Sequence, residues 1–211
     1  MLLEGLELKK SPFVIGITGH RQLPPEQLHA LTVEIQAFYE EKKAQHNVKN
    51  ITVLSPLAEG ADMLCAKLAL DADLRLVVPL PMNALEYRKD FSESAAAMFD
   101  CLLSRADQVF VVSPEEPVPA GHTRGFYYRQ AGLYIAKHSD VLLAVWDLQE
   151  RNSSDGAGTW ETIKLAQGFD RQIHRVTLSR DTHDDLSKEH AHYSKPCSSS
   201  RPIQISKVPP L

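Results

Sequence analysis

Cysteine is scarce in this chain of 211 residues, and long apolar runs are missing. The three cysteines, Cys65, Cys101 and Cys197, are far apart and form no CxxC pair, which favours a reducing compartment without a disulfide framework. No apolar run is long enough to span a bilayer, and acidic side chains interrupt residues 1–10, where a signal peptide would be apolar. We therefore expect a cytoplasmic protein with no membrane partner.

An excess of basic charge is also missing. The formal net charge is -4 at pH 7, and the sequence pI is about 6.1. Proteins that bind the phosphate backbone of nucleic acids usually have a basic surface. The composition therefore argues against nucleic acid as a partner, and any anion site is expected to be local.

Several common catalytic motifs are absent from the sequence. It contains no HExxH, no Walker GxxxxGK[ST], no GxSxG and no GxGxxG. His183, His190 and His192 are potential metal ligands, but they lie in a polar tail that fixes no geometry. We expect no metal site and no cofactor.

What the sequence does contain is a regular alternation of two patterns. Short apolar runs predict buried strands at 13–18, 51–54, 74–79, 108–112, 141–146 and 173–178. Apolar residues at helical spacing predict helices at 24–39, 58–70, 84–105 with a break near Ser92, 125–138 and 159–167.

This alternation predicts an α/β fold, a Rossmann-like three-layer sandwich around a mostly parallel sheet. The expected strand order is 3-2-1-4-5, with room for a sixth strand at one edge. We divide the chain into an N-terminal extension (1–12), a Rossmann-like nucleotide-binding domain (13–178) and a flexible polar tail (179–211).

The first candidate binding loop follows the first predicted strand and contains Thr18, Gly19, His20 and Arg21. In a sheet of this kind, ligands bind beyond the carboxyl ends of the strands, near the switch predicted between the first and fourth strands. Gly19 allows close approach of the backbone to a ligand, and Arg21 can pair with a phosphate. The alternative is a tight turn with a solvated arginine.

The second candidate loop follows the second predicted strand and contains Ser55, Glu59, Gly60 and Asp62. The free amides of the helix that begins here favour an anion. The two acidic side chains oppose a phosphate, so they would hold ribose hydroxyls or cap the helix.

The third candidate loop precedes the last predicted helix and contains Gly156, Gly158 and Thr159. Two glycines and a threonine at a helix start form a nest for phosphate. The alternative is a flexible loop in which Thr159 caps the helix.

In this order, the loops resemble those of the SLOG superfamily of Rossmann-like nucleotide-binding domains. The similar segments are 16–21, 54–62, and 136–140 followed by 156–161. The superfamily includes the Lonely Guy phosphoribohydrolases and the DNA-processing protein of bacterial competence. Over residues 13–178, the resemblance implies a phosphate-binding loop, a nucleotide-type ligand and a homodimer.

The resemblance also implies a catalytic pair, Arg129 and Glu161, but this chain departs from the Lonely Guy pattern. That family has its glutamate at the position of Thr162, one residue after Glu161. Binding or sensing of a nucleotide or nucleotide-derived phosphorylated ligand is therefore the leading hypothesis. The alternatives are a nucleoside-monophosphate phosphoribohydrolase of Lonely Guy type, in which Glu161 or Glu59 assists cleavage of the N-glycosidic bond, and a non-catalytic scaffold.

Overall fold

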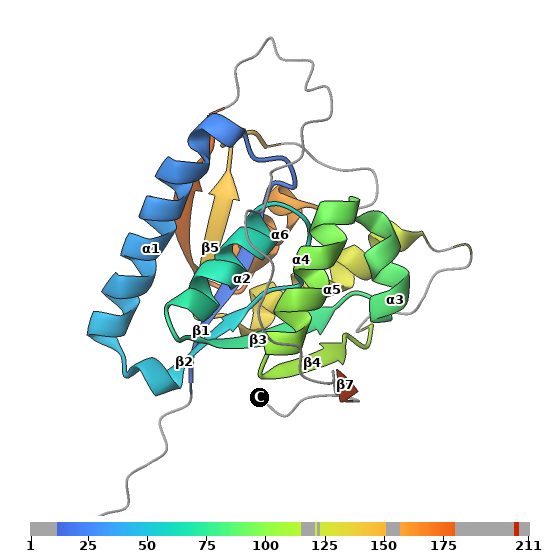
Figure 1. The fold of residues 1–211 in the computed structure, drawn as a ribbon, viewed down its shortest axis with the longest axis horizontal. Helices are drawn as coiled ribbons and strands as arrows, with labels where there is room; N and C mark the ends of the chain where they lie inside the picture. The colour runs from blue at the N-terminus through green and yellow to red at the C-terminus, as the bar shows by residue number, and fades with distance from the viewer. Residues whose placement is uncertain (1–11, 115–120, 122, 151–156, 180–204, 207–211) are drawn as a thin grey trace, which may run out of the picture.

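The computed structural model describes residues 12–114, 121, 123–150, 157–179 and 205–206, and its centre is a parallel sheet (Figure 1). The strands are β1 (Phe13–Gly19), β2 (Ile51–Leu54), β3 (Arg75–Leu80), β4 (Gln108–Val111), β5 (Val141–Trp146), β6 (Gln172–Thr177) and β7 (Ile205–Ser206). Their order is β6-β5-β1-β2-β3-β4-β7, and every neighbouring pair is parallel.

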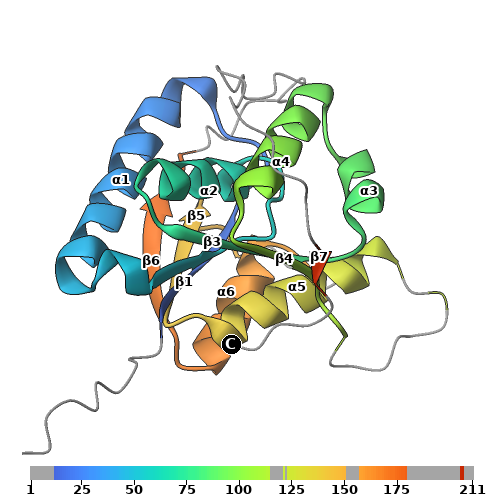
Figure 2. The same cartoon turned by 60° about the horizontal axis from the view of Figure 1, so that its bottom comes forward.

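Helices cover both faces of the sheet (Figure 2). One face carries α1 (Leu28–Gln45), α2 (Ala61–Asp71), α3 (Ala84–Tyr87) and α4 (Glu93–Arg105), and the other carries α5 (Arg124–His138) and α6 (Thr159–Gly168). Short 3-10 helices occur at η1 (Pro25–Gln27), η2 (Val48–Asn50) and η3 (Arg88–Asp90). The prediction of a Rossmann-like α/β sandwich is confirmed.

The central strands are apolar on both sides because helices pack against both faces of the sheet. All six residues of β5 are buried, as are all four of β2. The predicted break near Ser92 is also present. Ser92 is the N-cap of α4, and its hydroxyl accepts a hydrogen bond from the Ala95 amide at 3.3 Å.

The predicted strand order was wrong in one respect. We expected the fourth strand beside β1, but β4 pairs with β3, and β5 takes the place beside β1. The helix α4 lies on the same face as α2, so its crossover adds β4 at the outer edge. The chain then crosses to the other face, and α5 returns it to the middle of the sheet. The switch point therefore lies between β1 and β5.

The cysteines do not follow the expectation that the chain has no disulfide. Cys65 is a free, buried thiol, whereas Cys101 on α4 is disulfide-bonded. Spacing along the chain cannot exclude such a bond, because the fold decides which cysteines meet.

Both predicted terminal segments fall largely outside the described residues, so the proposed domain boundaries stay a prediction. Within 179–211, Ile205 and Ser206 pair with Val109 and Phe110 of β4. In the described part of the chain, no helix has the length and apolar character needed to cross a membrane.

Candidate functional site

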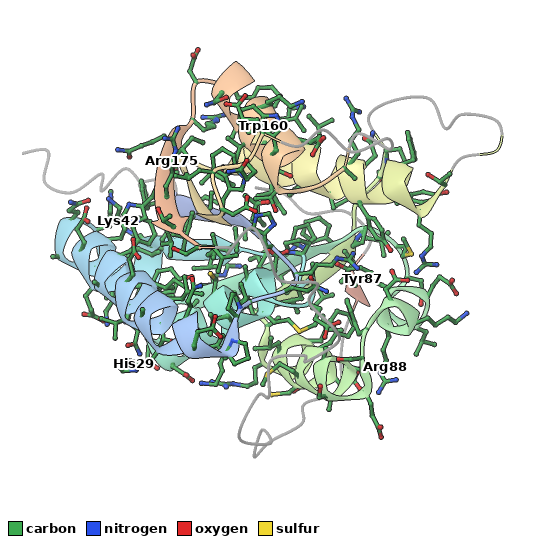
Figure 3. All side chains as sticks on the ribbon, turned by 90° about the horizontal axis from the view of Figure 1, so that it is seen from above. His29, Lys42, Tyr87, Arg88, Trp160 and Arg175 are labelled. Carbon is green, nitrogen blue, oxygen red and sulfur yellow. The ribbon has the colours of Figure 1, made fainter. Side chains whose placement is uncertain are left out.

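A cavity of about 620 Å³ opens at the carboxyl ends of β1 and β5, at the switch point of the sheet. Its wall combines residues 18–22 at the end of β1 and just after it, residues from the β2–α2 and β3–α3 connections, one face of α5, and residues 157–162 at the start of α6. Figure 3 shows labelled side chains from the two sides, Tyr87 on α3 and Trp160 on α6.

The first predicted loop lines this cavity through Thr18, Gly19, His20 and Arg21. Gly19 is required here for space. A Cβ at this position would lie 2.4 Å from the Cβ of Ala61, at the start of α2. The loop is therefore pressed against α2, and it forms the floor of the cavity.

His20 is held by an acidic residue that the sequence analysis missed. Its Nε2 lies 2.9 Å from Oδ1 of Asp147, whose side chain is 2% exposed. The Asp147 amide also donates a hydrogen bond to Nε2 at 3.3 Å, so the backbone and the side chain of Asp147 both contact this ring nitrogen. Asp147 directly follows β5, and an acidic residue immediately after a buried strand is the signal that could have revealed it.

Three residues of the second predicted loop do not line the cavity. The Ser55 hydroxyl is fully buried, donates to the Asp62 carbonyl and accepts from the Leu57 amide. Glu59 accepts hydrogen bonds from the amide and hydroxyl of Ser92. These two side chains stabilise the α2 and α4 ends.

Gly60, the third of these residues, is the N-cap of α2 with φ +93°. The neighbouring Ala61 amide donates to the His20 carbonyl at 3.0 Å. The start of α2 thus packs against protein backbone, so the phosphate that we expected at 55–60 has no support in this geometry.

Asp62 is the member of the second loop that reaches the cavity wall. It is 5% exposed, and its Oδ1 has no hydrogen-bond partner among the described residues. Burial raises its pKa to about 7, although a hydrogen bond from the Ala58 backbone and the charge of Arg21 act in the opposite direction.

Arg21 is an exposed side chain at the cavity rim, and its guanidinium lies over the ring of Tyr128, 5.5 Å from the centroid. Tyr128 is fixed in turn, since its hydroxyl donates to Asp90. Arg124 donates to both Asp90 and Glu86, at 2.9 and 2.7 Å. This network joins α5 to α3 and η3 and positions one wall of the cavity.

The third predicted loop is present in part, because Gly156 lies outside the described residues. Gly158 is the N-cap of α6 with φ +137°, and Thr159 is the first helical residue rather than the cap. Both line the cavity, as does the buried Glu161. The first turn of α6 borders the cavity with its positive dipole end, and a carboxylate oxygen of Glu161 lies 3.0 Å from where a Gly158 Cβ would be.

Arg129, the other predicted catalytic residue, does not line the cavity. The cavity face of α5 is formed by Tyr128, Ala131, Gly132 and Ile135. These residues follow the i, i+3, i+4, i+7 spacing of one helix face, and Arg129 is turned about 100° away from Tyr128. The structure therefore brings Glu161 to the cavity without Arg129.

No group of three or more potential metal ligands occurs among the residues that the structure describes. His183, His190 and His192, which the sequence analysis considered, lie outside that part of the chain.

Comparison with known proteins supports the assignment of the fold. No protein family and no curated protein matches the sequence. DNA processing protein A from Streptococcus pneumoniae aligns with a TM-score of 0.52 and 17% identity over 84% of this chain. The alignment spans 53% of the S. pneumoniae chain, so this protein corresponds to about half of it. DNA processing protein A from Helicobacter pylori aligns with a TM-score of 0.49 and 13% identity, over 82% of this chain and 68% of that one. The likeness supports the Rossmann-like fold, whereas membership of the SLOG superfamily stays a prediction.

The comparison with the S. pneumoniae protein also contradicts our prediction that nucleic acid is an unlikely partner, because that neighbour is a DNA processing protein. The physical error lies in using the net charge of the whole chain. That sum averages over the entire surface, whereas a strand responds to the local field at its groove.

Proposed function

We propose that the cavity binds a nucleoside phosphate moiety, supplied either by a free nucleotide or by single-stranded nucleic acid. The observation that supports this proposal is the set of groups that line one cavity. A glycine-capped helix start, an exposed arginine and tyrosine rings meet at the switch point of a parallel sheet.

The phosphate would bind at the start of α6. The first-turn amides of a helix point toward an anion, and the helix dipole adds a favourable field. Gly158 adds no side chain at this end, but a carboxylate oxygen of Glu161 lies 3.0 Å from where a Gly158 Cβ would be, and its charge opposes an anion. Arg21 at the rim supplies a guanidinium that would offset this charge and form paired hydrogen bonds with phosphate oxygens.

The base would bind on the other side of β1, between α3 and α5. Tyr87 and Tyr128 line this part of the cavity, with their ring centroids 6.0 Å apart. Pro56 and Pro81 add further apolar surface. Flat apolar walls of this kind suit a planar base, because stacking on aromatic rings does not depend on the identity of the base.

The cavity size is compatible with this ligand. Small-molecule sites usually have volumes of roughly 300–1,000 Å³. The cavity of about 620 Å³ lies within that range and would accommodate one nucleotide unit. The DNA processing protein of S. pneumoniae supports a strand as one source of that unit.

Replacing Arg21 by glutamine is expected to weaken nucleotide binding about tenfold or more, because a charge-assisted contact to phosphate is lost. Both tryptophans of the chain line the cavity, and their rings stack at 5.3 Å. Their fluorescence can therefore report titrations with AMP, GMP, CMP and UMP, and with oligonucleotides of about ten nucleotides.

Arg75→Gln is the matched control for this titration. Arg75 is exposed and lies at the first residue of β3, at the opposite end of the sheet from the cavity. Its removal subtracts the same charge, so affinity should stay at the wild-type value. Equal losses in the two variants would mean that Arg21 acts only through net charge, and a wild-type protein that binds neither nucleotides nor oligonucleotides would contradict the proposal.

We do not extend the proposal to phosphoribohydrolase activity. Glu161 lies in the cavity wall, but Arg129, its expected partner, does not. Incubation of the protein with AMP provides the test, since release of free adenine that disappears in Glu161→Gln would establish hydrolysis.

A further inference from the structure

We infer that Asp62 recognises the base, by accepting a hydrogen bond from the amino group on the edge of adenine, cytosine or guanine. This inference rests on the proposed function, because it assigns the base of the ligand to the end of the cavity opposite the proposed phosphate site. It goes beyond that function by predicting discrimination between bases that carry an amino group and bases that do not.

Asp62 has a buried carboxylate oxygen that lacks a hydrogen-bond partner among the described residues. A buried polar atom without a partner is costly, and native proteins rarely leave one. Asp62 is 5% exposed, receives a hydrogen bond from the Ala58 backbone, and retains Oδ1 without a partner among the described residues. A hydrogen-bond donor on a bound ligand would satisfy this oxygen. The cost of the unpaired oxygen would then be removed in the complex and remain in the free protein.

Asp62 and the proposed phosphate site line the cavity from opposite faces of the sheet. Asp62 comes from α2, on the same face as α3, whereas Gly158 comes from α6 on the other face. A carboxylate repels phosphate but accepts hydrogen bonds from amino groups. A nucleotide with its phosphate at α6 would therefore direct its base toward Asp62.

The surroundings of Asp62 favour a base over a ribose. The cavity residues on this side include Tyr87, Pro56 and Pro81, whose rings offer flat apolar surface, with the Tyr87 hydroxyl as a further polar group. A buried acceptor beside these rings matches the edge of a planar base that carries an exocyclic donor. Such sites discriminate strongly, because the wrong ligand leaves the buried group unpaired.

Charged and titratable neighbours determine how this contact depends on pH. Arg21 from the end of β1 stabilises the Asp62 carboxylate, and Tyr87 from α3 and Cys65 on α2 interact with it electrostatically. The resulting pKa of Asp62 is about 7. The acceptor form therefore prevails at pH 8, and the protonated form prevails at pH 6.

Access to Oδ1 requires a local movement, since this oxygen is shielded from solvent. Arg21 is the charged neighbour that can move readily, because its side chain is exposed. We expect the guanidinium to shift from Tyr128 toward the phosphate when a nucleotide enters.

The test compares ligands that differ in one donor. Wild type, Asp62→Asn and Asp71→Asn are titrated at pH 6 and pH 8 with the pairs AMP and purine riboside monophosphate, CMP and UMP, and GMP and IMP. Oligomers of about ten deoxycytidines or ten deoxyuridines provide the same comparison for a strand. Asp71 is the control, since it lies on the same helix but is exposed and paired with Lys67.

At pH 8 the wild type should bind the amino-bearing member of at least one pair about tenfold more tightly, as expected for a missing partner of a buried group. The ratio of the two affinities should fall several-fold at pH 6. Because both members of a pair carry the same phosphate, the titration of the phosphate does not affect this ratio. Asp62→Asn should bring the ratio close to one at both pH values, while Asp71→Asn keeps the wild-type ratio.

Two outcomes would overturn the inference and leave the proposed function intact. One is nucleotide binding by the wild type without preference for an amino group in any pair, and the other is an unchanged preference in Asp62→Asn. If the wild type binds none of the nucleotides or oligomers, both the inference and the proposed function fail. A preference confined to the oligomers would support the inference and identify the strand as the source.

Discussion

Substitution of Gly60 by alanine is expected to lower the free energy of unfolding by at least about 3 kcal/mol, the range for a strained backbone combined with a steric clash. Gly60 has φ +93° and ψ -122°, a combination that side-chain-bearing residues avoid. A Cβ there would also lie 2.1 Å from the Arg21 carbonyl oxygen and 2.5 Å from that of His20. Both clashes involve backbone atoms, so no side-chain rotation relieves them.

Urea denaturation followed by circular dichroism measures this effect, and Gly168→Ala is the control. Gly168 is the last residue of α6, and a Cβ there would meet nothing within 4 Å. That variant should stay within about 0.5 kcal/mol of the wild type, as surface substitutions usually do. A Gly60→Ala protein of nearly wild-type stability would show that the loop after β1 does not press on the start of α2.

The Asp62→Asn variant is expected to gain stability relative to the wild type as the pH rises from 5 to 8. Burial raises the pKa of Asp62 from its ordinary value of 3.8 to about 7, so the folded state holds this proton more tightly than the unfolded chain. The resulting stability is fully present below about pH 4 and is lost as the pH rises through 7. Wild type therefore carries a buried carboxylate at pH 8, which the variant lacks.

The size of this effect follows from linkage at about 1.4 kcal/mol per pH unit. Between pH 5 and pH 8, the stability of Asp62→Asn relative to wild type should rise by about 2.5 kcal/mol, or roughly 5–10 °C in melting temperature. Urea denaturation at both pH values measures the difference, and Asp71→Asn should show no such rise. A relative stability that is independent of pH would show that Asp62 has an ordinary pKa.

Asp62→Asn is expected to gain stability above pH 7 and to lose the preference for bases with an amino group. Observed together, these two effects would identify a role of Asp62 in recognition. A carboxylate retained for packing alone would cost stability above pH 7 and return nothing in binding. A carboxylate retained for recognition costs stability in the free protein and is satisfied in the complex, as is common at functional sites.

The sequence predicted the elements well where local chemistry dominates. The apolar runs at 51–54 and 141–146 coincide with β2 and β5, since strands buried on both faces are continuously apolar. The helix break was also predictable, because Ser92 is a good N-cap. The positions of β4 and β5 in the sheet were not, because the choice of edge depends on which face each crossover helix covers.

The candidate site was predictable only as a set of loops. The loop after β1 and residues 158 and 159 line the cavity, because parallel strands place the turns after their carboxyl ends at one edge of the sheet. Ser55, Glu59 and Gly60 looked equally suitable in the sequence. The Ser55 hydroxyl instead bonds within its own loop, to Leu57 and Asp62. Glu59 and Gly60 contact Ser92 and the His20–Arg21 backbone, which are more than thirty residues away along the chain.

The sequence by itself therefore determined the α/β class, the parallel sheet and the loops at its carboxyl edge. These depend on side-chain periodicity and backbone freedom, which act over a few residues. The tertiary structure alone decided the switch between β1 and β5, the contact of His20 with Asp147, and the burial that leaves Asp62 with an unsatisfied oxygen. Those properties depend on which distant segments pack together, and burial has no local signature in a helix as apolar as α2.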